Sequence, residues 1–435
     1  MAKIKRILLE CTHTFENDIN TGIQRVVRNI VKESNRLAKE FDLEIVPTVV
    51  KYGYFWKVVK KNRFAVYRAA CIAWLKKLYG KIRPVVMKLS PSGNLERMVF
   101  LTVQFTGGFL VNALFFPYFW WTDGKKKFVP CKGDLILLLD SSWVYPIWPA
   151  VRKAKAKGAI VGLVVYDLIQ ITHCQFFAKA MTERFVNWFE AAVAEVDFFM
   201  AISKSVRDEI QKYISAGCPN HRLIGHADFF KLGSVMDGGS SVKEMAQREL
   251  VDIFETRDNS FYLTVGTIEP RKNHNYLLEV FELIWQKSPE VGLCIVGKVG
   301  WQCEDFVQKV KSHSLYGKSL YMFNDLSDAG LDYCYRHAKS LIFPSHAEGF
   351  GLPIVEALYK GLPVLASDIP IFREVGKDFC TYFDQMNPVS LANIICKIEK
   401  EGKMPEVRRP EQYQLSDWAD SCRELITKSL ALSQK

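Results

Sequence analysis

The stretch FPSHAEGFGLPIVEALYKGLPVLASD, residues 343–368, holds the pattern on which the fold assignment depends. It begins at the end of one short apolar run and finishes with another, PVLASD. Between the two runs, Glu348 and Glu356 stand eight positions apart across a glycine-rich turn that contains Pro353. Because proline is tolerated in the first turn of a helix, we expect a strand, a glycine turn and a helix that begins near Pro353. The pattern alone leaves open whether the carboxylates act as acid and base, as metal ligands or otherwise.

Similar units of strand and helix lie on both sides of this stretch. Short runs rich in β-branched residues alternate with segments of helical period, at residues 134–140, 159–167, 198–203, 261–266, 293–297, 340–345 and 363–368. This alternation predicts βαβ units and parallel sheets. Ligands bind beyond the carboxyl ends of the strands in such sheets, so the Gly, Asp and Ser residues that end several runs are expected to point toward a site.

The length and composition indicate an α/β protein of ordinary globular character. With 435 residues, 49% hydrophobic and 24% charged, the chain is expected to form two domains with their own cores. Its eleven cysteines are scattered without a Cys-x-x-Cys pair, which favours free thiols in a reducing cytosol over disulfides or a zinc site. The start, MAKIKRILLECTHT, has no small-residue cleavage site and is interpreted as a first strand rather than a secretory signal.

The net charge of +11 is concentrated in one part of the chain. Residues 45–95 contain no Asp or Glu, and an apolar, aromatic stripe that includes Trp74 recurs there at helical spacing between Lys and Arg residues. A basic amphipathic helix of this kind suits an anionic membrane surface, and it equally suits a core helix with a solvated basic face. No nucleic-acid-binding motif accompanies it, so nucleic acid is not an expected partner.

An uncharged segment follows at residues 99–121. It is long enough to span a bilayer. Gln104, Asn112 and Pro117 would then sit at membrane depth, and the first part alternates like a strand. A buried strand pair or a loop that dips into the membrane is therefore favoured over a membrane span.

The spacing of Glu348 and Glu356 resembles the signature of retaining glycosyltransferases of family four, which have the GT-B fold. Residues 265–281, 295–301 and 368–376 are similar to other segments of that family in the expected order. In the first half, residues 20–31 and 164–173 resemble acceptor-domain segments of members that build bacterial surface polysaccharides, with mannosyl or hexosyl transfer as the activity.

The resemblance implies an α/β protein with two Rossmann-like parallel-sheet domains that face a central cleft. An acceptor-binding domain is expected at residues 1–228, with a basic and aromatic membrane-proximal insert at about 51–121. A nucleotide-sugar-binding domain is expected at residues 229–412, and a final helix at residues 413–435 is expected to cross back to the first domain.

The donor site is expected at the turn between the two glutamates. Backbone amides and the dipole of the following helix suit a diphosphate. By resemblance, Glu356 contacts the ribose, Glu348 accepts hydrogen bonds from the sugar hydroxyls, and the donor-binding set is Gly22, Gly266, Arg271, Lys272, Gly349, Phe350, Gly351, Leu352 and Glu356. Arg271 and Lys272 can neutralise charge on the leaving nucleoside diphosphate. Asn273 and His274 are expected to cap the next helix.

The acceptor side is less defined by the sequence. Many family members carry a histidine directly after a central strand of the first domain, whereas here that strand ends in Asp167, and His173 comes six residues later. Asp167 and His173 are candidate catalytic residues that contact the acceptor, with a strand-end cap and a buried histidine as the structural alternatives. His13 and the segment 140–143 are weaker candidates for the same cleft.

The resemblance implies retaining, front-face transfer of a hexose, with mannose as the first hypothesis, from a GDP- or UDP-linked sugar to a glycan or lipid-linked acceptor. The chain contains no Asp-x-Asp pair, and with the cationic loop this predicts an enzyme without a metal ion or cofactor. The protein is expected in the cytoplasm, peripheral on the inner face of the membrane. A sugar-nucleotide epimerase or hydrolase of the same fold and an inactive scaffold or lectin-like homologue stay open as alternatives.

Overall fold

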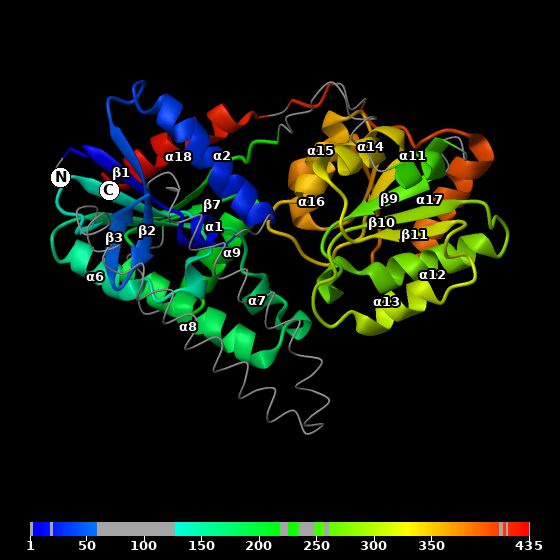
Figure 1. Ribbon diagram of the computed structural model, residues 1–435, viewed down its shortest axis with the longest axis horizontal. Helices are drawn as coiled ribbons and strands as arrows, with labels where there is room; N and C mark the ends of the chain where they lie inside the picture. The colour runs from blue at the N-terminus through cyan, green and yellow to red at the C-terminus, as the bar shows by residue number, and fades with distance from the viewer. Residues whose placement is uncertain are drawn as a thin grey trace, which may run out of the picture.

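The computed structural model describes residues 3–17, 21–58, 127–217, 225–234, 248–255, 261–408, 412–414 and 416–434. These residues form two α/β domains that lie side by side (Figure 1). The basic amphipathic helix and the uncharged segment 99–121 predicted above lie outside the described residues. Within the described ranges, no helix is both long enough and apolar enough to cross a membrane.

The first domain is built on an eight-stranded sheet with the order β4-β3-β2-β1-β5-β6-β7-β8. Its strands are β1 (Arg6–Glu10), β2 (Glu44–Lys51), β3 (Tyr54–Lys57), β4 (Lys127–Phe128), β5 (Asp134–Leu138), β6 (Ile160–Val165), β7 (Phe198–Ala201) and β8 (Ala227–Phe229). The pairs that β3 makes with β2 and β4 are antiparallel, and the others are parallel. The strand order changes direction between β1 and β5, which makes this the switch point of the first sheet.

Both faces of the first sheet are covered, which explains why residues 7–9 of β1 and 135–138 of β5 are apolar. Alternate residues of β1 and β5 enter two separate cores: Ile7 and Leu135 pack on one side, Leu8 and Ile136 on the other. The helices of this domain are α1 (Thr12–Glu16), α2 (Gly22–Leu37), α6 (Trp148–Lys155), α7 (Ile169–Thr172), α8 (Lys179–Glu195) and α9 (Lys204–Ser215).

The second domain has a six-stranded, fully parallel sheet with the order β11-β10-β9-β12-β13-β14. Its strands are β9 (Phe261–Val265), β10 (Gly292–Val296), β11 (Leu320–Phe323), β12 (Ser340–Phe343), β13 (Val364–Ser367) and β14 (Cys380–Phe383). Its helices are α11 (Arg248–Glu255), α12 (His274–Trp285), α13 (Glu304–Lys311), α14 (Asp328–His337), α15 (Leu352–Tyr359), α16 (Pro370–Gly376) and α17 (Pro388–Glu401). The switch point of this sheet lies between β9 and β12.

The last helix, α18 (Trp418–Leu432), lies beside α2 of the first domain (Figure 1). Its residues Cys422 and Leu425 share a core cluster with Val27 and Ile30 of α2. The two connections between the domains also touch, since the Ser234 amide donates to the Ser416 carbonyl at 3.3 Å. The chain therefore leaves the first domain and returns to it at one place.

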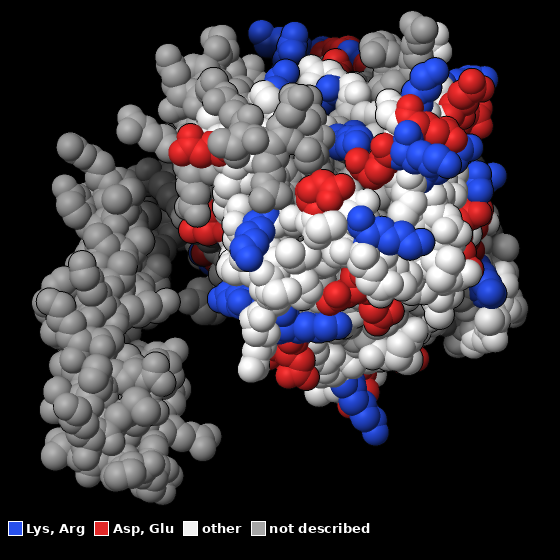
Figure 2. All heavy atoms as spheres, turned by 90° about the vertical axis from the view of Figure 1, so that its right-hand side faces the viewer, with Lys and Arg blue, Asp and Glu red and all other residues white. Residues whose placement is uncertain are grey.

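The charge of the second domain is mixed on its outer end. Figure 2 shows Lys and Arg side chains interspersed with Asp and Glu on the face that points away from the first domain. Interspersed charges of both signs are typical of a solvated surface. This visible face is therefore no candidate for a basic docking surface.

Candidate active site

Three of the predicted site residues meet at the switch point of the second sheet. The loop after β9 forms a short 3₁₀ turn, Pro270–Lys272, and the loop after β12 carries Glu348. Arg271 Nη1 lies 2.8 Å from Glu348 Oε2, and Lys272 Nζ donates to Glu348 Oε1 at 2.5 Å. The His346 amide donates to the Arg271 carbonyl at 2.9 Å and ties the two loops together. The structure thus unites Arg271, Lys272 and Glu348 where a parallel sheet binds its ligand.

The charged groups of this cluster shift one another's pKa values. Burial would raise the pKa of Glu348, but the Arg271 and Lys272 charges outweigh it and lower that pKa to about 2. Burial lowers the pKa of Lys272, with Glu348 acting in the opposite direction. Arg271 Nε also lies 2.5 Å from Glu269 Oε1. The site therefore presents an ionised carboxylate between two cations that the protein has already oriented.

The glycine turn after Glu348 is shaped by two different constraints. Gly351 is the N-cap of α15 and has a φ of +100°, a conformation that side chains rarely adopt. Gly349 instead lacks space, because a Cβ atom there would lie 2.0 Å from the Tyr166 carbonyl oxygen of the first domain. The glycine turn of the second domain thus contacts the backbone of the first domain at Tyr166.

Gly22, Phe350 and Leu352 lie where the two domains meet. Gly22 begins α2, and a Cβ atom on it would lie 3.7 Å from Cδ1 of Leu352, the first residue of α15. Phe350 packs against core clusters of both domains. Gly266 stands beside Lys272, whose Cε and Nζ would lie 3.4 Å from an added Cβ atom. The predicted donor-binding residues therefore come from both domains.

Glu356 is 2% exposed and lies one turn inside α15. It accepts a hydrogen bond from the Tyr335 hydroxyl at 2.8 Å and forms a 2.8 Å ion pair with Arg25 Nη2. Arg25 belongs to α2, so this ion pair joins the domains. Arg25 was not predicted from the sequence, although its place one turn after Gly22 could have indicated it. A ribose at Glu356 would have to share this carboxylate with Arg25 or displace it.

The acceptor candidates Asp167 and His173 flank the short helix α7. Asp167 Oδ1 accepts a hydrogen bond from the Ile169 amide at 3.2 Å. Desolvation raises the pKa of Asp167, and the charge of Arg271 from the other domain opposes this. His173 stacks on Phe176, and Phe176 stacks on His346 of the second domain with ring centroids 5.2 Å apart. Both candidates are therefore near the loops of the charged cluster.

A second pair of carboxylates lies at the switch point of the first sheet. Glu10 ends β1, Asp140 follows β5, and they are 1% and 2% exposed. Asp140 accepts hydrogen bonds from the Thr14 and Ser141 amides at 2.6 and 2.8 Å. Burial, followed by the charge of Asp140, raises the pKa of Glu10 to about 7. Glu10 was not among the residues predicted from the sequence, although it ends a strand just as Asp140 does.

The other weak candidates are close to this pair. His13 Nδ1 lies 3.0 Å from Gln24 Nε2, and the His13 ring lies 5.9 Å from the ring of Tyr145. Ser142 and Trp143 form a 3₁₀ turn directly after Asp140 and Ser141. Ser141 and Ser142 are buried, so contact with an acceptor there needs a rearrangement.

The prediction that Asn273 caps the next helix is correct for its position, but no side-chain hydrogen bond makes the cap. Asn273 occupies the N-cap position of α12 with a left-handed φ of 59°, but its side chain donates to the Gln385 carbonyl at 3.2 Å instead. His274 is buried behind Lys272, and burial followed by the Lys272 charge lowers its pKa to about 3. A neutral His274 adds no third positive charge to Arg271 and Lys272. Within the part of the chain that the structure describes, no group of three His, Cys, Asp or Glu residues could hold a metal ion.

Residues 247–414, which include the charged cluster, match the family model described as Glycosyl transferases group 1. The chain carries a glycosyl transferases group 1 domain. The serotype-specific mannosyltransferase WbdA of Escherichia coli is 28% identical to the chain over 310 residues, which are 69% of this chain and 37% of WbdA. The O-antigen chain mannosyltransferase RfbU of Salmonella typhimurium is 28% identical over 177 residues, 40% of this chain and 48% of RfbU. The chain thus spans less than half the length of these relatives.

Solved structures support the fold of both domains. Anabaena Alr3699/HepE in complex with UDP and glucose superposes with a TM-score of 0.52 and 13% identity, covering 99% of this chain and 97% of that one. Sucrose-phosphate synthase from Thermosynechococcus elongatus gives a TM-score of 0.53 and 14% identity, covering 99% and 94%. The predicted GT-B architecture, in which the group 1 domain faces a second Rossmann-like domain, is confirmed.

Proposed function

We propose that the protein is a retaining hexosyltransferase that moves a hexose, mannose in the first instance, from a nucleoside-diphosphate sugar to a glycan or lipid-linked acceptor. The observation that carries the proposal is the cluster of Arg271, Lys272 and Glu348 beyond β9 and β12 of the group 1 domain. Two oriented cations suit a diphosphate, and a fixed carboxylate suits sugar hydroxyls. The names of WbdA and RfbU support mannose as the sugar and O-antigen glycan as the acceptor class.

In the proposed reaction, Arg271 and Lys272 stabilise the negative charge that develops on the leaving nucleoside diphosphate. Glu348 orients the sugar ring through its hydroxyls. A donor phosphate oxygen accepts the proton of the attacking hydroxyl on the same face, so the anomeric configuration is retained. Asp167 and His173 contact the acceptor. Because the two cations supply the charge stabilisation, no metal ion or cofactor takes part in this proposal.

The proposed place of action is the inner face of the cytoplasmic membrane. The acid-free window at residues 45–95 supports it through eleven cations and an aromatic stripe, which suit anionic lipid. Flotation with vesicles tests this part separately. Binding is expected to require anionic lipid and to weaken at high salt, because screening shortens the range of the attraction from about 10 Å at 0.1 M to about 3 Å at 1 M. Equal binding to neutral vesicles would contradict it.

The activity is tested with a panel of GDP- and UDP-linked hexoses, with and without a lipid-linked oligosaccharide extract. Transfer is expected from one donor, dependent on the extract, with product of the same anomeric configuration by NMR. Glu348→Gln, which removes the charge but keeps the shape, is the inactive control. Nucleotide release without acceptor would indicate a hydrolase, conversion of the donor sugar an epimerase, and no turnover with any donor a scaffold or lectin-like protein.

A further inference from the structure

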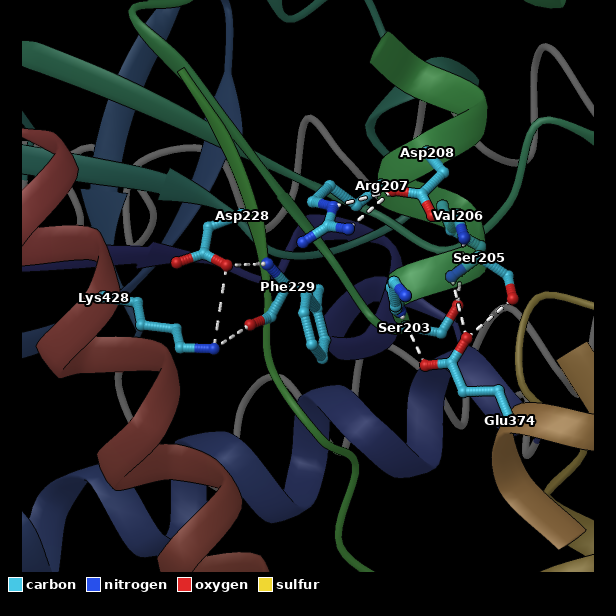
Figure 3. A network of polar contacts seen from close by, with 10 residues as sticks. Ser203, Ser205, Val206, Arg207, Asp208, Asp228, Phe229, Glu374 and Lys428 are labelled. Atoms are coloured by element: carbon cyan, nitrogen blue, oxygen red, sulfur yellow. Dashed lines mark hydrogen bonds and ion pairs between the residues drawn. The ribbon is translucent and has the colours of Figure 1, made fainter. Parts of the chain in front are cut away.

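Glu374 of the second domain reaches the N-terminus of α9 in the first domain (Figure 3). Its Oε1 accepts a hydrogen bond from the Lys204 amide at 2.7 Å. Its Oε2 accepts bonds from the Ser205 amide at 2.8 Å and the Ser205 hydroxyl at 2.6 Å. The first amides of a helix have no partner within the helix, and its dipole favours an anion there. One carboxylate of the second domain thus completes a helix of the first.

The residue before this helix makes a second contact between the domains. Ser203 is the N-cap of α9, and its Oγ accepts a hydrogen bond from the Val206 amide at 3.2 Å. The same hydroxyl donates to the Gly349 carbonyl at 2.9 Å. Gly349 directly follows Glu348, and the absence of a side chain lets it lie against the Tyr166 carbonyl. The loop that carries Glu348 is therefore bonded to the end of α9 that Glu374 caps.

The N-terminal part of α9 is itself anchored in the first domain. The Arg207 guanidinium lies over the Phe229 ring of β8 at 5.1 Å, and Arg207 also pairs with Asp208 at 2.6 Å. Lys428 of α18 donates to the Phe229 carbonyl and lies 3.7 Å from Asp228 (Figure 3). The contacts of Glu374 and Ser203 consequently attach the second domain to the start of α9, which is itself packed against β8.

We propose that Ser203 and Glu374 are positioning residues that hold the two domains closed and set the Glu348 loop for transfer. The proposal rests on the function proposed above and deepens it. Neither residue needs to touch the donor or the acceptor. Ser203 acts through Gly349, and Glu374 acts through the closed arrangement that brings Asp167 and His173 toward the charged cluster.

This role separates donor binding from turnover. Gly22 is the one predicted donor-binding residue in the first domain, and Arg271, Lys272 and Glu348 all belong to the second, so a nucleotide can bind these three residues when the domains are apart. Transfer needs the acceptor residues of the first domain as well. Charge-assisted hydrogen bonds are stronger than neutral ones, so loss of the Glu374 charge is expected to populate the open arrangement. We expect kcat to fall roughly tenfold, with nucleotide affinity changed less than about twofold.

The test uses the full chain with Glu374→Gln, Ser203→Ala and the milder Ser205→Ala, which removes one of the three bonds to Glu374. Glu304→Gln is the matched control, because Glu304 is an exposed glutamate in the first turn of a helix of the same domain. Small-angle scattering with and without nucleotide measures domain closure, calorimetry measures nucleotide affinity, and assays give kcat and KM. Thermal unfolding confirms that each variant is folded.

A larger radius of gyration and a lower kcat for Glu374→Gln and Ser203→Ala, with a smaller change of the same sign for Ser205→Ala, would support the proposal. Unchanged scattering of both variants would overturn the claim that Ser203 and Glu374 hold the domains closed. A larger radius of gyration with unchanged kcat would overturn their positioning role. Wild-type protein that transfers no sugar would instead refute the proposed function. The scattering comparison would then still decide whether these residues hold the domains together.

Discussion

Each of the two sheets has a carboxylate at its switch point, and the pKa values of these two carboxylates are shifted in opposite directions. Glu348 lies at the switch point of the second sheet between Arg271 and Lys272, and its pKa falls to about 2. Glu10 lies at the switch point of the first sheet beside Asp140, and its pKa rises to about 7. Both carboxylates are largely shielded from water, so burial acts in the same direction on each. The difference comes from the neighbouring charge.

This contrast shows what each side of the cleft can offer a ligand. Glu348 stays ionised over the whole physiological range, because its pKa is about 2. Glu10, with a pKa of about 7, exchanges its proton near neutral pH, so its charge changes where that of Glu348 does not. Location at a switch point predicts that a residue faces the cleft, but the charge it carries depends on its partners.

The largest expected effect concerns the donor side. Glu348→Ala and Lys272→Ala should each lower kcat/KM by at least roughly 100-fold, which is about 2.7 kcal/mol of transition-state stabilisation. Lys287→Ala, an exposed lysine beyond α12, serves as the control. If either site variant turns over like the wild type, the mutated residue has no role in transfer, and the charged cluster at the second switch point is not the donor site.

The next effect concerns the stability of the first domain. The folded-state pKa of Glu10, about 7, lies above its unfolded value of 4.5, so protonated Glu10 stabilises the fold fully below about pH 4.5, and this contribution is lost as pH rises through 7. Between pH 5 and 8 the loss amounts to about 2 kcal/mol in the free energy of unfolding. Glu10→Gln mimics the protonated form and should lack this loss in denaturant titrations at the two pH values. Parallel pH profiles for the variant and the wild type would count against it.

A smaller effect is expected for the ion pair between the domains. Arg25→Gln removes the cation from the buried carboxylate of Glu356, and Glu356→Gln removes the carboxylate. A double-mutant cycle on nucleotide affinity should give a coupling of about 1 kcal/mol, since the two groups are in direct contact. Additive effects within about 0.3 kcal/mol would show that Arg25 and Glu356 act independently in donor binding.

The smallest effect is expected from removal of divalent ions. Because Arg271 and Lys272 provide the positive charge at the donor site, activity should be unchanged in excess chelator. The measurement is the rate of nucleotide release before and after chelation. A loss of activity that Mn²⁺ or Mg²⁺ restores would contradict this prediction, because Arg271 and Lys272 alone would then be insufficient to stabilise the leaving group.

Local sequence patterns predicted the parallel sheets, and the family resemblance assigned Glu348, Arg271 and Lys272 to one donor site. The structure brings these three side chains into contact, because the strand ends at a switch point are adjacent. The GT-B fold is confirmed, while the roles of the site residues stay predictions. Contacts between the domains could not be predicted in the same way. Arg25, Ser203 and Glu374 have polar partners far away in the sequence, and these partners meet only when the domains are oriented. Asn273 shows the same limit, since its side chain donates a hydrogen bond to the Gln385 carbonyl and none to its own helix.

The chain passes between the domains twice, and this limits how the domains can move. Residues 234 and 416 are hydrogen bonded where the two connections leave the first domain, so both tethers are fixed at one shared point. A single tether would permit rotation about several axes, whereas two adjacent tethers resist twisting and favour one swinging motion. Opening of the cleft is therefore expected to behave as a movement with few degrees of freedom, and residues far from this pivot should travel furthest.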